Sequence, residues 1–292
     1  MFRNTVKTAV LLSALGAVLV AGGAAIGRGT GLVIGLLLAL ALTGGSYWFS
    51  DRIAVRAAGA VPVTEAQVPE YYAIVRDLCA RSGLPMPRLH ISPSQQPNAF
   101  ATGRNPEHAA VAVTAGILQV CSWDELRGVL AHEMSHVGNR DILISSVAAT
   151  LAMAITMLAR LAWFADIFAG GDRREGEQGA FASLALIIFA PLAAALLQLA
   201  LSRSREYQAD ASGARLIGDG EPLARALEKL DRASRQIPMP QTRPEMAALY
   251  IVNPLNGRQV DFGRFFSDHP PTAERIARLR GGEWAGQGRR GR

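Results

Sequence analysis

The residues best suited to chemistry are two histidines four positions apart, with a glutamate beside the first. His132, Glu133 and His136 lie in the stretch VLAHEMSHVGN. Residues four apart share one face of an α-helix, so both imidazoles can present a nitrogen to one zinc ion at about 2.0–2.1 Å. Zinc lowers the pKa of a bound water toward about 7, and Glu133 can take that proton as the water attacks a carbonyl. The pattern predicts one Zn²⁺ per chain and hydrolysis, with a solvated helix face as the alternative.

A catalytic zinc needs a third protein ligand and an open fourth position. The stretch SRSREYQADASGARL offers Glu206 and Asp210 on one helical face. We expect Glu206 to be the third ligand and Asp210 to accept a hydrogen bond from a ligand imidazole. The alternative is a surface helix whose carboxylates pair with nearby arginines. The rival third ligands are Asp141, His108 and His269.

The elements around these residues predict an α+β domain. Ser122 and Glu125 form a capping-box pattern, which predicts a helix running through His136. Short strands are expected at residues 88–92 and at the start of 109–118, and the segment 97–103 leads into or out of an extended piece. Apolar spacing predicts further helices at residues 67–82, 204–216, 221–236 and 270–280.

Four apolar stretches are long enough to cross a bilayer. Half of the 292 residues are hydrophobic, and about 20 apolar residues span ~30 Å of hydrocarbon. A cleaved signal peptide is a poor alternative for the first stretch, because its apolar run is too long and a second follows at once. The expected spans cover residues 6–27, 30–50, 142–168 and 179–202.

The basic residues predict how the spans are oriented. Those flanking the spans gather on one side, which the positive-inside rule assigns to the cytoplasm. Both termini and the His132 site are then cytoplasmic. The resulting division is a transmembrane hairpin at 1–50, the first part of the catalytic domain at 51–141, a second hairpin at 142–202, the second part of the domain at 203–280, and a disordered basic tail at 281–292.

Charge and cysteine content exclude two other classes. The net charge is +6, but the basic residues lie at membrane boundaries and in the tail, where lipid headgroups explain them better than a nucleic acid. Cys79 and Cys121 are too few and too far apart for a zinc knuckle, so we expect free thiols.

Four motifs resemble the HtpX family of membrane-bound zinc metalloproteases, which is related to the CAAX prenyl proteases. They are NAFATG, AHEMSHVGNRD, SRSREYQADASGARLIG and DHPPTAERIARL. The resemblance implies a mostly α fold, with four transmembrane helices and a cytoplasmic α+β zincin-type domain with a small sheet. It also implies zinc at His132, His136 and Glu206, with Glu133 catalytic. The implied activity is that of an inner-membrane endopeptidase in stress response and membrane-protein quality control, acting on misfolded or damaged membrane proteins.

Two further segments are candidates for a functional role, the first of them by its resemblance to that family. Asn98, Ala99, Phe100 and Ala101 match the segment beside the cleft, whose backbone can pair with an extended substrate. The alternative is a structural turn. His269 is a candidate oxyanion stabiliser, with a histidine packed at a helix start as the alternative.

Two other readings stay open. One is an intramembrane protease of the site-2 type, although here the histidine motif has polar flanks rather than lying inside an apolar span. The other is a non-enzymatic membrane scaffold with structural zinc, which would normally have four protein ligands, usually including cysteine.

Overall fold

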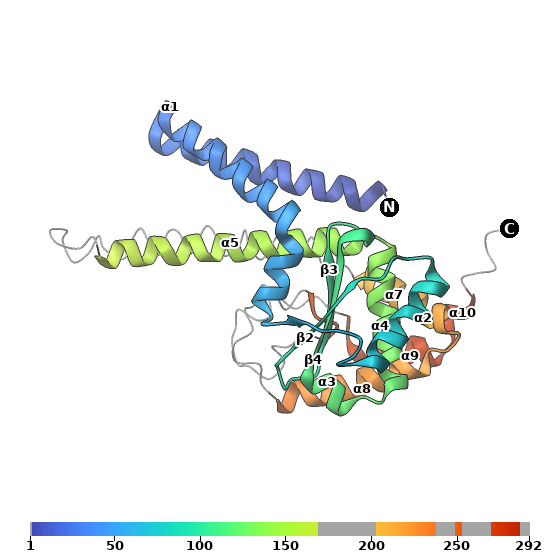
Figure 1. Cartoon of the computed structure of the whole chain (residues 1–292). Helices are drawn as coiled ribbons and strands as arrows, with labels where there is room; N and C mark the ends of the chain where they lie inside the picture. The colour runs from blue at the N-terminus through green and yellow to red at the C-terminus, as the bar shows by residue number, and fades with distance from the viewer. Residues whose placement is uncertain (1, 169–202, 238–248, 253–269, 287–292) are drawn as a thin grey trace.

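A computed structural model describes residues 2–168, 203–237, 249–252 and 270–286 (Figure 1). These residues form a mostly helical chain with one small mixed sheet. The prediction of a mostly α fold with a small sheet is therefore confirmed.

The sheet has four strands in the order β1-β2-β4-β3. They are β1 (Val61–Pro62), β2 (Arg88–Ser92), β3 (Ala99–Gly103) and β4 (Ala109–Thr114). The β2–β4 pair is parallel and the other two pairs are antiparallel. Val111 of β4 joins the core beneath the domain helices, whereas its neighbour Ala112 joins the core against the long helices. Burial of both faces explains the continuous apolar run in β4. The strand order leaves β3 at one edge of the sheet.

The domain helices are α2 (Pro69–Ser82), α3 (Ala115–Val120), α4 (Trp123–Gly138), α7 (Arg203–Ile217), α8 (Glu221–Gln236), α9 (Thr272–Arg280) and α10 (Glu283–Gly286), with a 3₁₀ turn η1 (Pro106–His108). The predicted capping box is present at the start of α4. The Ser122 hydroxyl accepts from the Glu125 N–H at 3.3 Å, and the Glu125 carboxylate accepts from the Ser122 N–H at 2.8 Å. This cap fixes where α4 begins, and the spacing of four residues then places both histidines on one face of the helix.

Two short helices were not expected. The start of α3 is capped by the Thr114 hydroxyl, which accepts from the Ile117 N–H. The prediction of a disordered tail from residue 281 is wrong for residues 281–286, which include α10. Its Trp284 packs against the core, and the indole N–H donates to the Leu279 carbonyl at 3.0 Å. The glycine- and arginine-rich composition of this segment did not predict such packing, which a single tryptophan provides.

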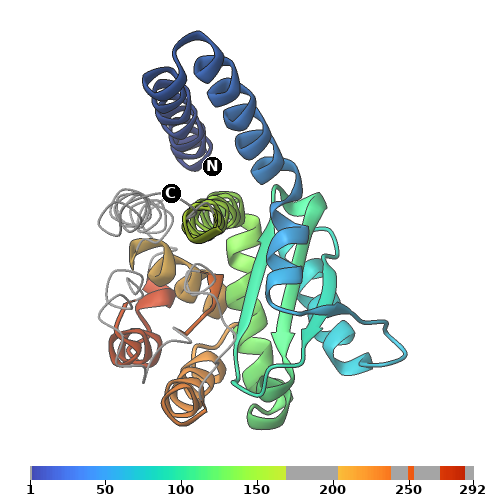
Figure 2. The same ribbon diagram turned by 90° about the vertical axis from the view of Figure 1, so that its left-hand side faces the viewer.

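Two long helices extend away from the domain: α1 (Phe2–Ala57) and α5 (Asp141–Phe168). α1 doubles back on itself, and its two arms lie side by side in Figure 2. A Cβ on Gly35 would lie 2.6 Å from the Leu19 carbonyl oxygen, although sixteen residues of straight helix would separate them by about 24 Å. α1 also packs against α5 and the sheet through residues such as Ala54, Val147 and Leu151.

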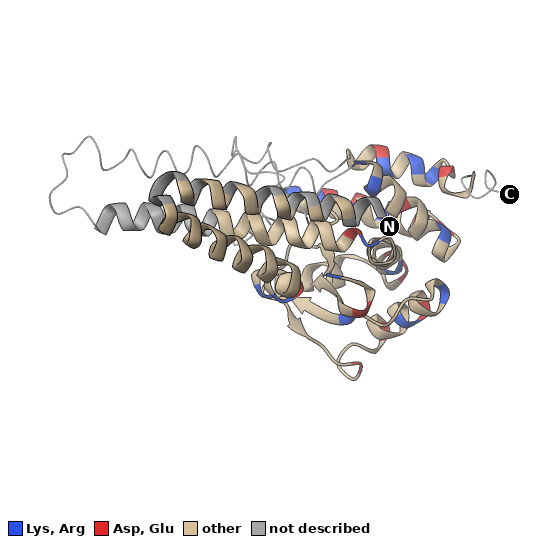
Figure 3. Cartoon of the chain, turned by 90° about the horizontal axis from the view of Figure 1, so that it is seen from above, with Lys and Arg blue, Asp and Glu red and all other residues tan. Residues whose placement is uncertain are grey.

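Four spans are not confirmed. Among the described residues, one helix is long and apolar enough to cross a membrane, Gly29–Ala57, with a mean hydropathy of 1.8. The described apolar part of α5, Asp141–Ile155, is shorter than a span. The expected fourth span at 179–202 lies outside the described residues. Figure 3 shows that Lys, Arg, Asp and Glu gather on the domain, while the projecting helices are almost free of them.

Candidate metal centre

Helices α4 and α7 bring three donor side chains together. His132 and His136 come from α4 and Glu206 from α7, and one donor atom of each lies within 4.8 Å of the others. The two Nε2 atoms are 3.1 Å apart. Glu206 oxygens lie 3.5 Å from the His136 Nε2 and 3.7 Å from the His132 Nε2. Adjacent ligands of tetrahedral zinc, each about 2.05 Å from the metal, lie about 3.3 Å apart, so this donor set fits such an ion.

Two glycines let neighbouring helices approach α4 closely. A Cβ on Gly213 of α7 would lie 2.9 Å from the His132 backbone nitrogen. A Cβ on Gly128 of α4 would lie 2.5 Å from the backbone nitrogen of Leu223 in α8. Any larger residue would push the helices apart. The spacing between the histidines and Glu206 therefore depends on these two positions.

A carboxylate contacts the Nδ1 atom of each histidine, the ring nitrogen that does not face the donor cluster. The His132 Nδ1 lies 2.9 Å from an Asp210 oxygen, and the His136 Nδ1 lies 3.4 Å from an Asp141 oxygen. Such partners place the ring proton on Nδ1. Both Nε2 lone pairs then point toward Glu206, an arrangement that needs a cation or a proton between them. Asp210 lies beside the imidazole of His132, and its expected role in orienting a metal ligand stays a prediction.

The charges around the cluster shift its pKa values. Burial alone lowers the pKa of His136, but Asp141, Glu206 and Glu133 outweigh burial and raise it to about 9. Burial lowers the pKa of His132. Burial opposes ionisation of Asp210, yet the adjacent Arg275 guanidinium brings its pKa down to about 2. At neutral pH the metal-free site therefore holds an ionised Asp210 and a proton on His136.

We predict that zinc binding at pH 7 releases close to one proton from His136. A group with a pKa of about 9 is almost fully protonated at pH 7, and a ligand imidazole must be neutral. Titration calorimetry in buffers of different ionisation enthalpy measures this release directly. Above pH 9 the metal-free histidine has already lost its proton, so the release should fall to the smaller amount that a metal-bound water supplies. A constant release between pH 7 and 10 would contradict the assignment.

Glu133 lies beside the cluster in a fully enclosed position. Its side chain is 2% exposed, and burial raises its pKa to about 7, although the nearby His136 charge and a backbone hydrogen bond from Ala101 pull the other way. A carboxylate with this pKa can both take and return a proton near neutral pH. The arrangement can therefore support base catalysis beside a bound metal ion.

The predicted substrate segment lies on the edge strand, and the chain itself contacts it there. Asn98 and Ala99 are fully buried. The Ile251 N–H donates to the Ala99 carbonyl at 3.1 Å. The Asn98 side chain donates to the Val252 carbonyl at 2.7 Å and accepts from the Val252 N–H at 3.3 Å. We call residues 249–252 the strap. The part of β3 that lies beyond the strap and beside Glu133 is the neighbourhood of Ala101.

The rival third ligands do not join the cluster in the described residues. Asp141 faces Nδ1 of His136, on the side of the ring opposite the converging Nε2 atoms. His108, at the end of η1, is exposed and contacts Asn105, the residue before this turn. His269 lies outside the described residues, so its expected oxyanion role stays a prediction.

Sequence reasoning missed Arg275 in α9. Its side chain is 2% exposed, and it donates two hydrogen bonds to Asp210, at 2.7 and 2.8 Å. The sequence did contain a signal, because Arg275 lies four residues before the buried Leu279 and so on the same face of α9. A charged residue on a buried helix face needs a partner.

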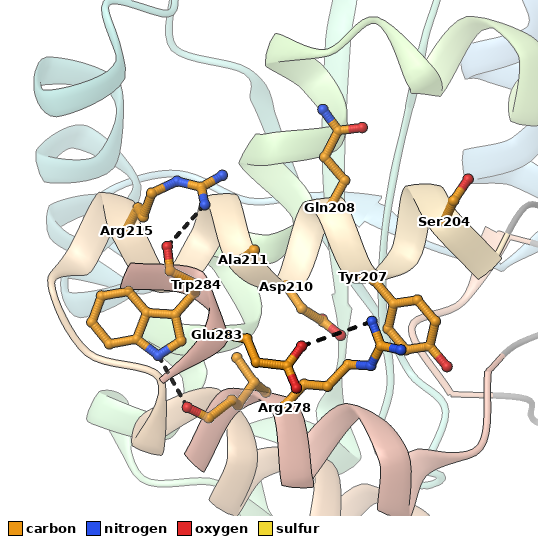
Figure 4. Close-up of a pocket in the computed structure, with 10 residues that line it drawn as sticks. Ser204, Tyr207, Gln208, Asp210, Ala211, Arg215, Arg278, Glu283 and Trp284 are labelled. Atoms are coloured by element: carbon orange, nitrogen blue, oxygen red, sulfur yellow. Dashed lines mark hydrogen bonds and ion pairs between the residues drawn. The ribbon is translucent and has the colours of Figure 1, made fainter. Parts of the chain in front are cut away.

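A groove on the other side of α7 has a volume of about 370 Å³ (Figure 4). Tyr207 lines it, and the Arg278 guanidinium carbon lies 3.9 Å from the centre of the tyrosine ring. Asp210 also reaches the groove, next to its contact with His132. Tyr207 therefore packs under an arginine here and does not belong to the donor cluster.

Known proteins resemble this chain over most of its length. Residues 65–283 match the model of Peptidase family M48. A Protease HtpX homolog of Syntrophobacter fumaroxidans is 52% identical over 277 residues, covering 94% of this chain and 98% of that protein. A Protease HtpX homolog of Pelotomaculum thermopropionicum is 51% identical over 278 residues, with the same coverage.

Among solved structures, the crystal structure of S. mikatae Ste24p is 19% identical, with a TM-score of 0.48, and the match covers 95% of this chain and 66% of that one. The family match covers the helix with both histidines and the helix with Glu206. The chain therefore belongs to peptidase family M48, alongside the HtpX proteases, and is a metallopeptidase.

Proposed function

We propose that this chain is a zinc-dependent endopeptidase of the membrane. The observation that carries the proposal is the convergence of His132, His136 and Glu206, with Glu133 enclosed beside them. Two imidazoles and one carboxylate are the donor set of a catalytic zinc site with an open position, whereas a structural site is closed by four ligands. Among the described residues, no cysteine joins the cluster, which disfavours a scaffold with structural zinc.

Each residue has a distinct role in this proposal. His132, His136 and Glu206 hold the ion, and Asp210 and Asp141 fix the two imidazoles. Bound zinc supplies a Lewis acid that polarises a carbonyl and acidifies a water. Glu133 takes the proton of the attacking water and returns it to the leaving amine. The burial that raises its pKa to about 7 suits both transfers.

The substrate would bind in extended form beside β3. Glu133 receives a backbone hydrogen bond from Ala101, so a peptide lying along this end of the edge strand would place its carbonyl near the base. Main-chain pairing binds many sequences with little side-chain preference. The strap already occupies Asn98 and Ala99, so the substrate would either start beyond it or displace it. His269 stays our candidate for stabilising the oxyanion.

The membrane assignment rests on the long apolar helices. Only 17% of the apolar window in Gly29–Ala57 is buried, and large exposed side chains such as Leu37 and Leu40 surround it. Such a surface needs a lipid environment. We propose four spans in the bacterial inner membrane, with both termini and the site cytoplasmic, and misfolded membrane proteins as substrates. The polar flank of α4 disfavours a site-2 type protease.

The test is a metal-removal experiment on the full chain in detergent. Wild type is expected to hold one zinc per chain and to cleave unfolded casein. A chelator should abolish both, and zinc added back should restore both. Zinc binding without cleavage of casein or of any membrane-protein substrate would favour the scaffold. Cleavage that survives complete metal removal would overturn the proposal.

A further inference from the structure

Arg275 connects the metal cluster to the substrate edge. One end of its guanidinium donates to both oxygens of Asp210, which in turn contacts the His132 Nδ1 at 2.9 Å. Its Nη1 donates to the Ile251 carbonyl at 2.9 Å. The Ile251 N–H donates to the Ala99 carbonyl of β3. An unbroken series of polar contacts therefore runs from His132 through Arg275 and the strap to β3.

The planar guanidinium is suited to this junction. Its donors form a fixed fork, so a side chain gripping both oxygens of Asp210 can offer its remaining N–H groups only in set directions. Here one of these N–H groups donates to the backbone carbonyl of Ile251. Arg275 also lies 3.5 Å from the His132 Nδ1 and 4.0 Å from a Glu206 oxygen. A lysine could neutralise Asp210 but could not hold both ends of the junction.

The strap has few other attachments to β3 among the described residues. Besides Ile251, it is held by the two hydrogen bonds between Asn98 and Val252. The Tyr250 ring also packs edge-on against Phe100, with centroids 5.3 Å apart. The position of the strap therefore depends on a small number of contacts. One of them is the hydrogen bond from Arg275 to the Ile251 carbonyl, and Arg275 is itself held by Asp210 of the metal cluster.

We propose that Arg275 is a positioning residue that couples metal binding to the placement of the strap on β3. The inference rests on the proposed function, since it takes His132 as a metal ligand. An ion on the His132 Nε2 strengthens its Nδ1–H contact with Asp210, and Asp210 fixes the guanidinium that holds Ile251. Coupling of this kind is reciprocal, so a well-placed strap must in turn favour metal binding.

The strap would then define one end of the substrate-binding edge. With Ile251 on Ala99, an incoming peptide meets a fixed boundary next to Ala101. With the strap released, the edge extends over Asn98 and Ala99. The occupancy of the metal cluster would thereby set how many substrate residues can pair with β3.

Hydrogen exchange of the strap amides tests the coupling without relying on proteolysis. The full chain in detergent is compared with and without zinc, following peptides that contain Ile251 and Val252. In wild type, zinc is expected to slow exchange in the strap at least tenfold. In Arg275→Gln and Arg275→Lys this protection should be lost, and the dissociation constant for zinc should rise by about 10–100-fold. Arg280→Gln is the matched control, because Arg280 lies on the same helix and its ion pairs among the described residues are with Glu221 and Glu228, away from the metal cluster.

A second variant approaches the coupling from the other end. Asn98→Ala removes two strap contacts and touches none of the metal donors, so a weaker affinity for zinc in this variant supports the reciprocal effect. Strap exchange that does not change when wild type binds zinc would overturn the inference, even if Arg275→Gln fails to fold. If wild type binds no zinc at all, the proposed function fails first, and that result is separate and recognisable.

Discussion

Glu133→Gln is expected to keep one zinc per chain and to lose about 10²–10⁴-fold in kcat/KM for peptide-bond cleavage, the usual contribution of a general base. Glutamine has nearly the same shape, so it fits the enclosed position without opening a cavity. It cannot take a proton from water, and none of the three converging donors is changed. The measurement is zinc content by atomic absorption together with initial rates of casein cleavage.

Stability provides the control for this variant. The raised pKa of Glu133 means that the folded state favours its neutral form. Wild type without metal therefore loses stability as the pH rises from the ordinary carboxyl value through about 7, and glutamine does not suffer this loss. Metal-free Glu133→Gln should unfold at no lower temperature than wild type at pH 8. Asp124→Asn, an exposed change on the same helix, should leave the rate unaltered. Full activity in Glu133→Gln would remove this residue from the mechanism.

Local sequence signals predicted the helices that carry the candidate metal donors. A capping box fixes the start of α4, and spacing of four residues fixes which side chains share its face. The same spacing places Glu206 and Asp210 together on α7. These features depend on neighbours within one helical turn, so a single sequence is enough to show them.

Contacts between distant parts of the chain could not be predicted in this way. Arg275 and Asp210 are 65 residues apart, and Asn98 and Val252 are 154 apart. The hydrophobic periodicity of one helix does not show that a side chain on α9 will contact one on α7. The burial that raises the pKa of Glu133 likewise depends on how α4 packs against β3 and α7. The sequence therefore predicted the candidate donors and Asp210 beside them, but not Arg275, the contact between Asp141 and His136, or the strap beside β3.

Glu206→Gln is expected to raise the dissociation constant for zinc by more than about 100-fold. Loss of a residue that only orients a ligand costs about 10–100-fold, so loss of a direct ligand should cost more. Glutamine preserves the volume of this nearly buried side chain but removes the negative charge that offsets the ion. Casein cleavage at limiting zinc should fall to background, and excess zinc should restore part of it. Competition with a fluorescent chelator measures the affinity.

The decisive comparison is between two positions on the same helix. Gln208 lies two residues beyond Glu206 and is exposed, so Gln208→Ala should bind zinc as wild type does. If Glu206→Gln also binds zinc normally, Glu206 is not the third ligand. Asp141 would then be the next candidate, and its carboxylate would have to move from the His136 Nδ1 around the ring to reach the metal. Asp141→Asn in the Glu206→Gln background would test that alternative, because zinc binding should then disappear. The assignment of Glu206 thus depends on one affinity, measured against a neighbour on the same helix.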